Sequence, residues 1–188
     1  MRTGTFVRVA VVALAMTFAA SMASAQALSS GAQTIALNAT LAESLTLSLS
    51  ANAVNFTLSA GSAANPGSTG VTATTAWTLK PGRTAVAVYA YFASTTALTD
   101  GVGDNIPSSA FKISDNGGAS TALTNTVAFG AANAGLQLGA STAITGANKT
   151  GSRSDAMTFN IDLTGGTLPQ LPAAVYTGTL NIQAQATP

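Results

Sequence analysis

The segment 171–182, LPAAVYTGTLNI, joins a turn to an alternating run and decides the fold that the sequence predicts. Pro172 precedes Tyr176 by four residues. This spacing resembles a tyrosine corner, the Greek-key feature in which a tyrosine hydroxyl bonds to backbone a few residues upstream, although Ala174 stands where a glycine is usual. From Tyr176 to Ala186, apolar or small residues alternate with Thr, Asn and Gln. A period of two is that of a strand with one buried face, so this run is expected to be the last and longest strand of a sandwich.

The same alternation recurs along most of the chain, whereas no long stretch shows the spacing of a helix. Thr and β-branched residues are abundant, as is typical of strands. Turn signals separate the runs. The sequence therefore predicts an all-β fold, an immunoglobulin-like antiparallel β-sandwich of roughly nine or ten strands. The clearest runs are 34–41, 45–49, 54–58, 111–113 and 157–163.

Residues 71–94 have the pattern of a β-hairpin. Pro81 and Gly82 separate its two alternating arms, and they suit a type II turn because Pro presets one central dihedral and Gly accepts the positive φ of the next. The segment 140–155 is polar and interrupted by glycine, so it is expected to be a loop. The few charged residues are likewise expected in loops and turns, with Asp162 as the exception.

The first 25 residues have the three parts of a secretory signal peptide. Two arginines give a basic start, the apolar run 9–20 is too short to cross a bilayer, and 23–25 is a small-x-small cleavage pattern. Residues 26–32 would then be a flexible leader and 33–188 a single sandwich domain. No later run is long enough for a transmembrane segment. The chain is therefore expected to be exported to the periplasm, the cell surface or the extracellular space.

Composition excludes the commonest kinds of catalytic and binding site. The 188 residues include neither His nor Cys, and 7% are charged, against roughly 25% in ordinary globular proteins. The chain can therefore build no Ser-His-Asp triad, no Cys-His pair and no His/Cys metal site, and it has no basic patch for nucleic acid. The sequence predicts a protein that is not an enzyme and holds no cofactor or metal. Nearly uncharged strands favour self-association or association with other surface proteins.

Both ends of the mature chain resemble a known family. The segment 171–182 is similar to the last strand of cysteine-free bacterial surface-fibre subunits, the spore-coat-U-like and colonisation-factor-like chaperone–usher pilins, and 33–41 resembles their amino-terminal extension. The resemblance implies an incomplete sandwich that a neighbour's amino-terminal strand completes. In the alternative, 33–41 is the first strand of its own domain. The donor face would consist of four alternating residues, Ile35, Leu37, Ala39 and Leu41.

The predicted function is that of a secreted, non-catalytic structural or adhesive surface protein, such as a subunit of a pilus, a fibre or a matrix. A second function stays open, that of an extracellular carbohydrate- or surface-binding module. Tyr89 and Tyr91 point to the face opposite Val88 and Phe92, and two aromatic rings at this spacing can form a platform for sugar rings. The same spacing fits aromatic packing between neighbouring strands.

Overall fold

The computed structural model describes three parts of the chain, residues 28–124, residue 129 and residues 135–188. The expected signal peptide lies outside the described residues. Residues Leu41–Pro188 form one folded unit, and the described residues 28–40 do not belong to it.

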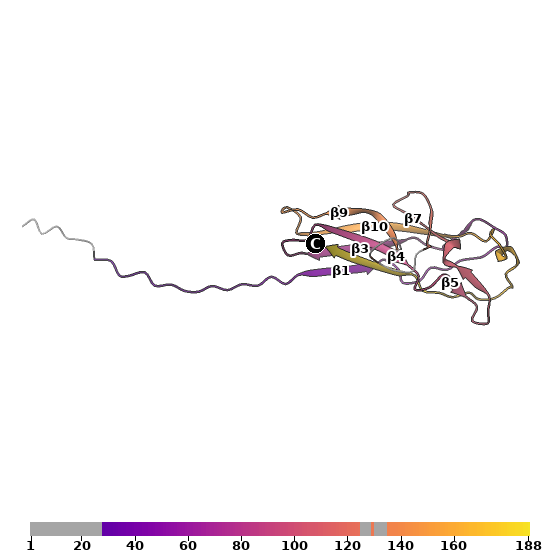
Figure 1. Ribbon diagram of the computed structural model, residues 1–188, viewed down its shortest axis with the longest axis horizontal. Coiled ribbons are helices and arrows are strands. Elements are labelled where there is room, and N and C mark those ends of the chain that lie inside the picture. Colours follow the sequence, from indigo (N-terminus) through magenta and orange to yellow (C-terminus); the bar gives the residue numbers. More distant parts are fainter. Residues whose placement is uncertain (1–27, 125–128, 130–134) are drawn as a thin grey trace, which may run out of the picture. The chain divides into compact units, whose positions relative to one another are not determined.

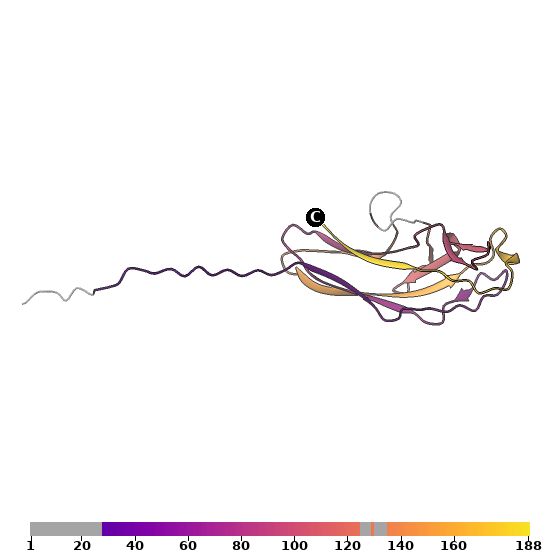
Figure 2. The ribbon, with the colours of Figure 1, turned by 90° about the horizontal axis from the view of Figure 1, so that it is seen from below.

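The folded unit consists of antiparallel sheets, so the all-β sandwich predicted from the sequence is confirmed. Figure 2 shows β1 and β10 in one layer and β11 in the other. The larger sheet has the strand order β1-β3-β10-β7-β8, and β2 also pairs with β10. Its strands are β1 (Ser44–Leu49), β2 (Asn65–Pro66), β3 (Val71–Thr78), β7 (Phe111–Asp115), β8 (Thr121–Ala122) and β10 (Thr150–Ile161).

The smaller layer is a three-stranded sheet with the order β11-β4-β9, and β5 pairs with β6 in a short separate ribbon (Figure 1). Two 3-10 helices, η1 (Ser108–Ala110) and η2 (Leu168–Gln170), complete the described elements. The remaining strands are β4 (Ala85–Tyr91), β5 (Thr96–Thr99), β6 (Asn105–Pro107), β9 (Leu136–Ala143) and β11 (Asn181–Thr187).

The core lies between the two sheets and is built by alternate residues, as a period of two requires. On β10 the side chains of Met157, Phe159 and Ile161 are buried, and Val88 of β4 faces them from the other sheet. Phe111 is the centre of an aromatic group, with its ring 5.1 Å from that of Phe92 and 5.9 Å from that of Phe159. Edge-on and tilted contacts of this kind are the favoured arrangements of aromatic rings.

The predicted hairpin 71–94 is wrong. Its two arms exist as β3 and β4, and the turn at Gly82 has the expected positive φ of 95°. However, β3 pairs with β1 and β10, while β4 pairs with β11 and β9 in the other sheet. Alternation fixes which face of a strand is buried but not which strand is its neighbour, so the turn crosses between sheets instead of closing a hairpin.

Three other expectations need correction. The segment 54–58 alternates in burial but forms only an isolated bridge, from Phe56 to Gly67. The expected loop 140–155 instead contains the end of β9 and the start of β10, which is the longest strand with 12 residues. The closing strand begins only at Asn181.

The expected strand at 34–41 is also absent from the described structure. Residues 28–40 contain no strand, and the folded unit begins at Leu41 and not at residue 33. The alternative in which 33–41 forms the first strand of its own domain is therefore not what the structure shows. No helix in the described part of the chain is long and apolar enough to span a membrane.

Candidate functional site: an open edge of the sandwich

A groove runs between two extended segments that belong to different layers. One wall is the segment 51–58, which follows β1, and the other is the segment 171–182, which leads into β11. Two adjoining cavities, of about 310 Å³ and about 710 Å³, share the side chains of Val54, Phe56 and Leu98. We call these two neighbouring cavities, which share lining side chains, the groove.

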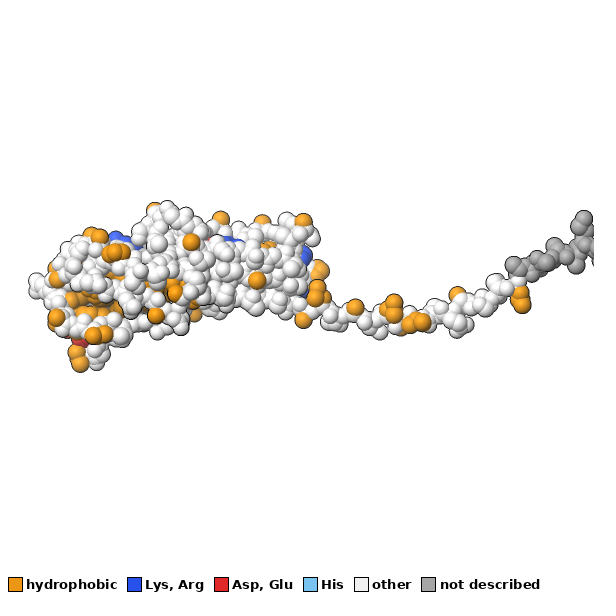
Figure 3. All heavy atoms as spheres, turned by 180° about the vertical axis from the view of Figure 1, so that it is seen from behind, with side chains coloured by type: hydrophobic (Ala, Val, Ile, Leu, Met, Phe, Trp, Pro, Cys, Tyr) orange, Lys and Arg blue, Asp and Glu red, His pale blue; other side chains and the backbone are white. Residues whose placement is uncertain are grey.

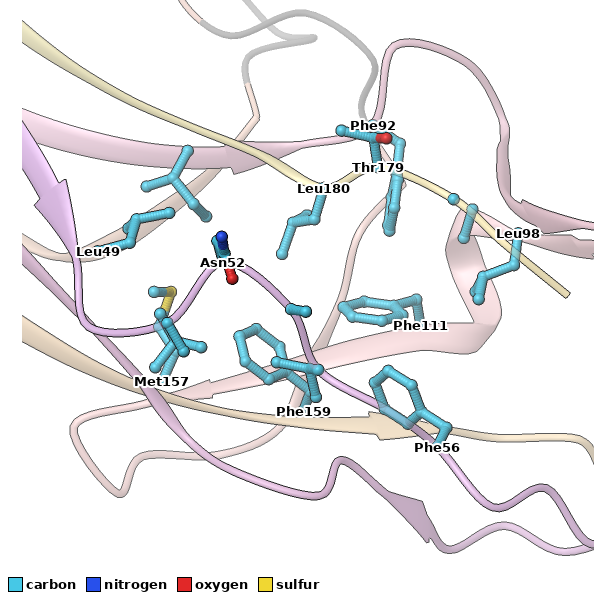
Figure 4. A pocket seen from close by; sticks show the side chains of 17 residues that line it. Leu49, Asn52, Phe56, Phe92, Leu98, Phe111, Met157, Phe159, Thr179 and Leu180 are labelled. Atoms are coloured by element: carbon cyan, nitrogen blue, oxygen red, sulfur yellow. The ribbon is translucent and has the colours of Figure 1, made fainter.

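The groove is lined mainly by apolar side chains. Figure 4 shows Phe56 on one wall and Leu180 on the other, with the ring of Phe111 between them, and the ring of Phe159 also lines the groove. Val54, Phe56, Leu58, Leu98, Leu180 and Ile182 pack against the core but are only partly buried. Core residues of a closed sandwich are normally covered on all sides, so this row of half-covered side chains marks a place where the core reaches the surface. Hydrophobic side chains also gather at the end of the folded unit drawn on the left in Figure 3.

The backbone along one wall has free hydrogen-bonding groups. Among the described strands, β11 lies at the edge of its sheet and pairs with β4 alone. Just before it, Thr177 bonds with Thr99, while no backbone hydrogen bond is made by residues 178–180 within the described parts of the chain. An extended segment with unpaired N–H and C=O groups is a template for another strand.

Gly178 allows this wall to lie directly on the β5 segment. A Cβ atom at Gly178 would lie 1.8 Å from the carbonyl oxygen of Ala97, which is backbone and cannot move aside cheaply. Glycine is used where two backbones approach this closely. The wall is thereby held against β5 on one side and left open on the side of the groove.

The tyrosine expected at a corner holds the same wall at its other end. The Tyr176 hydroxyl donates a hydrogen bond to the Pro172 carbonyl oxygen at 3.0 Å, which is the bond that a tyrosine corner requires. Alanine at position 174 does not prevent this geometry. The corner turns the chain from η2 into the extended segment that leads to β11.

Residues 28–40 precede the folded unit and are not part of it. Their side chains are exposed, and Ile35 and Leu37 are 86% and 89% exposed. Leu41, where the folded unit begins, is 84% exposed. Three large apolar side chains at alternate positions in water are unusual, because each loses about 1.5–3 kcal/mol relative to full burial.

The opposite edge of the sandwich is closed by a buried ion pair that sequence reasoning missed. Asp155 is 1% exposed and receives two hydrogen bonds from the guanidinium of Arg153. The same guanidinium donates to the carbonyl oxygens of Leu138 at 2.9 Å and Ala140 at 2.6 Å. Arg153 therefore ties β10 of the larger sheet to β9 of the smaller one.

The prediction that charged residues lie in loops is wrong for this region. Arg153 and Asp155 lie within β10, and Lys112 and Asp115 lie within β7, whereas Asp162 follows the end of β10. Burial is tolerated because the charges pair and Arg153 is fully hydrogen-bonded. A signal was present in the sequence, since Arg153 and Asp155 share the parity of Met157 and so face inward with it.

The carboxylates of Asp100 and Asp162 hold nearby segments in place through hydrogen bonds. Three backbone N–H groups, from Val102 to Asp104, donate to the Asp100 carboxylate and lower its pKa, which makes Asp100 a loop former as its turn-like context suggests. The Lys112 ammonium lies 2.8 Å from Asp162 Oδ2, and this bond is the main cause of the lowered pKa of Asp162. Within the described residues, no group of three acidic side chains could hold a metal ion.

Tyr89 and Tyr91 lie on the outer face of β4, away from the groove. Tyr89 donates a hydrogen bond to Gln137 and Tyr91 donates one to Gln183, both at 3.3 Å. The ring of Phe129 meets that of Tyr89 edge-on at 5.3 Å. The two tyrosines are thus brought together on one sheet face, as the sequence predicted, and are separate from the groove.

The comparisons with known proteins assign no family to this architecture. The chain matches no protein-family model, and no curated protein is significantly similar to it. A function for the groove therefore has to be argued from its own walls and from the chain that lies outside the folded unit.

Proposed function

We propose that the chain is a structural subunit of a surface fibre, in which residues 33–41 of one copy complete the open edge of the next copy. The observation that carries this proposal is the apolar groove beside the free edge of β11, in a chain that also holds an exposed alternating segment. Addition of a strand to a free sheet edge is an established mode of recognition.

The proposed donor segment and the groove wall are compatible in length and in polarity. Residues 33–41 make roughly 30 Å of strand, and the groove wall 171–182 is long enough to take all of it. In an extended segment, Ile35, Leu37, Ala39 and Leu41 all face one way and can enter the groove together. Neither the segment 33–41 nor the wall 171–182 contains a charged residue, so their association carries no cost from burying an ion.

Association through a segment that lies mainly outside the folded unit also sets the form of the assembly. A donor on one copy and a groove on the next make a head-to-tail contact, which generates an open chain of subunits unless it closes into a ring. Export through the predicted signal peptide, to the periplasm, cell surface or extracellular space, belongs to the same proposal. The protein would then act as a scaffold outside the cell and not as a catalyst.

The test is refolding of residues 26–188 followed by analytical ultracentrifugation and electron microscopy. The donor variant is Leu37→Ser, and its matched control is Asn38→Ser, which changes the next residue on the opposite face of the same segment. The groove variant is Leu180→Asp. We expect the unchanged chain and Asn38→Ser to form long assemblies, and we expect Leu37→Ser and Leu180→Asp to remain monomers with unchanged circular dichroism.

A mixing experiment makes the outcome decisive. The Leu37→Ser variant keeps an intact groove, and the Leu180→Asp variant keeps an intact donor, so the two refolded together should form dimers that do not grow. If the unchanged chain is a stable monomer at all concentrations and removal of residues 26–41 only lowers its stability, the fibre proposal is wrong.

A further inference from the structure

The outer face of the sheet β9-β4-β11 is free of charge. No charged residue occurs in Leu136–Ala143, Ala85–Tyr91 or Asn181–Thr187. The larger sheet differs, since β7 and β10 carry two charged residues each. The sheet face therefore offers no electrostatic attraction to ions, nucleic acid or charged peptides, and it suits a neutral partner.

The two tyrosines of this face bond to side chains on the two neighbouring strands. Tyr89 is directly opposite Gln137 of β9, and its hydroxyl bonds to that side chain. Tyr91 bonds in the other direction, to Gln183 of β11. Both tyrosines are partly exposed, so aromatic surface and amide groups lie side by side on this face.

Amide side chains surround the two rings. Gln137 and Gln183 are exposed, and each accepts the tyrosine hydroxyl through its oxygen. Gln137 also donates to the carbonyl oxygen of Gly139, whereas the nitrogen of Gln183 has no partner within the described residues. Amides carry both donors and acceptors, as do the hydroxyl groups of a sugar. Phe129 covers one side of Tyr89, which leaves Tyr91 as the ring without an aromatic neighbour among the described side chains.

We propose that this face binds a neutral polysaccharide, with the ring of Tyr91 as its main stacking surface and the amides of Gln183 and Gln137 as hydrogen-bonding groups. Apolar faces of sugar rings stack on aromatic rings, and their hydroxyl groups bond to neutral amides without the desolvation of a charge. An uncharged face matches a long neutral polymer, which can lie across several strands at once. The site does not depend on strand donation, because it lies on the outer surface of the sheet and the groove lies between the sheets.

The test is native affinity electrophoresis of the full mature chain in gels that contain dextran, hydroxyethyl cellulose or galactomannan, with anionic alginate as a fourth polymer. We expect retardation by at least one of the three neutral polymers. Tyr91→Ala should weaken the apparent affinity about ten-fold, because a stacking contact of about 1.4 kcal/mol is lost. Tyr91→Phe keeps the ring and should keep most of the retardation. The matched control is Ser154→Ala, an exposed position on the outer face of the other sheet.

Thermal unfolding of each variant separates loss of binding from loss of fold, because the single Trp77 reports unfolding from a distant part of the core. The proposal is overturned if none of the neutral polymers retards the unchanged chain, if Tyr91→Ala binds as well as the unchanged chain, or if alginate binds more tightly than the neutral polymers. Self-association that Tyr91→Ala abolishes, without retardation by any polysaccharide, would instead identify the face as a contact between copies and would also overturn the proposal.

Discussion

The two long edges of the sandwich differ in whether their side chains and backbone groups are paired within the chain. At one edge, Arg153 of β10 pairs with the buried Asp155 of the same strand and joins β9 through two hydrogen bonds to carbonyl oxygens. At the other edge, between the segments 51–58 and 171–182, apolar side chains and free backbone groups remain uncovered. We call these the closed edge and the open edge.

The difference shows what each edge requires. The closed edge is complete within one chain, and its charged groups satisfy one another. In the proposed fibre the open edge receives a strand from another copy, and its apolar side chains suit this role because the hydrophobic effect drives association from water. An uncharged free strand edge is also an aggregation hazard, and the proposed strand donation would direct that tendency into assembly.

The largest effect is expected from breaking the closed edge. Asp155→Asn removes the carboxylate that pairs directly with the buried guanidinium of Arg153, and loss of one partner of a buried pair costs about 3–5 kcal/mol of unfolding free energy. Urea unfolding followed by Trp77 fluorescence measures the loss. In the double variant Arg153→Met/Asp155→Leu both members of the pair are replaced by apolar side chains, and we expect part of the stability to return. A single variant as stable as the unchanged chain would show that the pair does not close this edge.

A somewhat smaller effect is expected from filling the open edge. A chain that begins at residue 42 keeps the groove, and a synthetic peptide of residues 33–41 should bind it. At 100 times its dissociation constant the peptide would add about 2.7 kcal/mol to the stability of the folded unit, by mass action alone. Calorimetry at increasing peptide concentration should show a rising Tm. The peptide with Leu37→Ser is the control, and an equal rise with both peptides would count against binding through the alternating face.

A third change loosens one wall of the open edge without removing apolar surface. Tyr176→Phe deletes the hydroxyl that bonds to Pro172 and should cost about 1 kcal/mol, the usual contribution of one hydrogen bond. The matched control is Tyr89→Phe, whose hydroxyl makes a longer bond of 3.3 Å to an exposed glutamine and should change stability little. Equal losses in the two variants would mean that the corner does not hold the wall. Chemical denaturation at neutral pH distinguishes these outcomes.

The same comparison explains how far the sequence predicts the molecule. Alternation correctly indicates an all-β sandwich and the inward faces of the strands, including Met157, Phe159 and Ile161. It does not indicate partners, because burial of one face is satisfied by any neighbouring strand. The arms of the expected hairpin 71–94 are therefore in different sheets.

Only part of the candidate site could be predicted from the sequence. The donor residues and Tyr176 can be identified from local patterns, but the groove depends on which segments lie opposite each other in three dimensions. The ion pair of the closed edge was missed for a different reason. Charged residues are rarely buried, so Arg153 and Asp155 suggested a loop, and only their common parity with Met157 pointed to a strand.

The smallest effects, and the most selective, concern pH. Burial, and then the charge of Asp155, raise the pKa of Asp115 at the closed edge, whereas hydrogen bonds from Lys112 and Thr164 lower that of Asp162. A raised carboxyl pKa means that the folded state binds more protons than the unfolded state, so Asp115 favours folding in acid and opposes it as pH rises through its raised pKa. Asp162 has the opposite effect, because its contribution is present above the ordinary carboxyl pKa of about 4 and is lost as pH falls toward its lowered value.

Two substitutions separate these contributions. We expect Asp115→Asn to raise Tm at pH 7, where the raised pKa costs stability, and to match the unchanged chain near pH 3. We expect Asp162→Asn to lower Tm at pH 7, with a difference that shrinks as the pH falls. Calorimetry from pH 3 to pH 8 measures both differences. Because Asp115 lies at the closed edge, Asp115→Asn should leave the affinity of the open edge for the 33–41 peptide unchanged. A change in that affinity would mean that the two edges are coupled through the core and do not act independently.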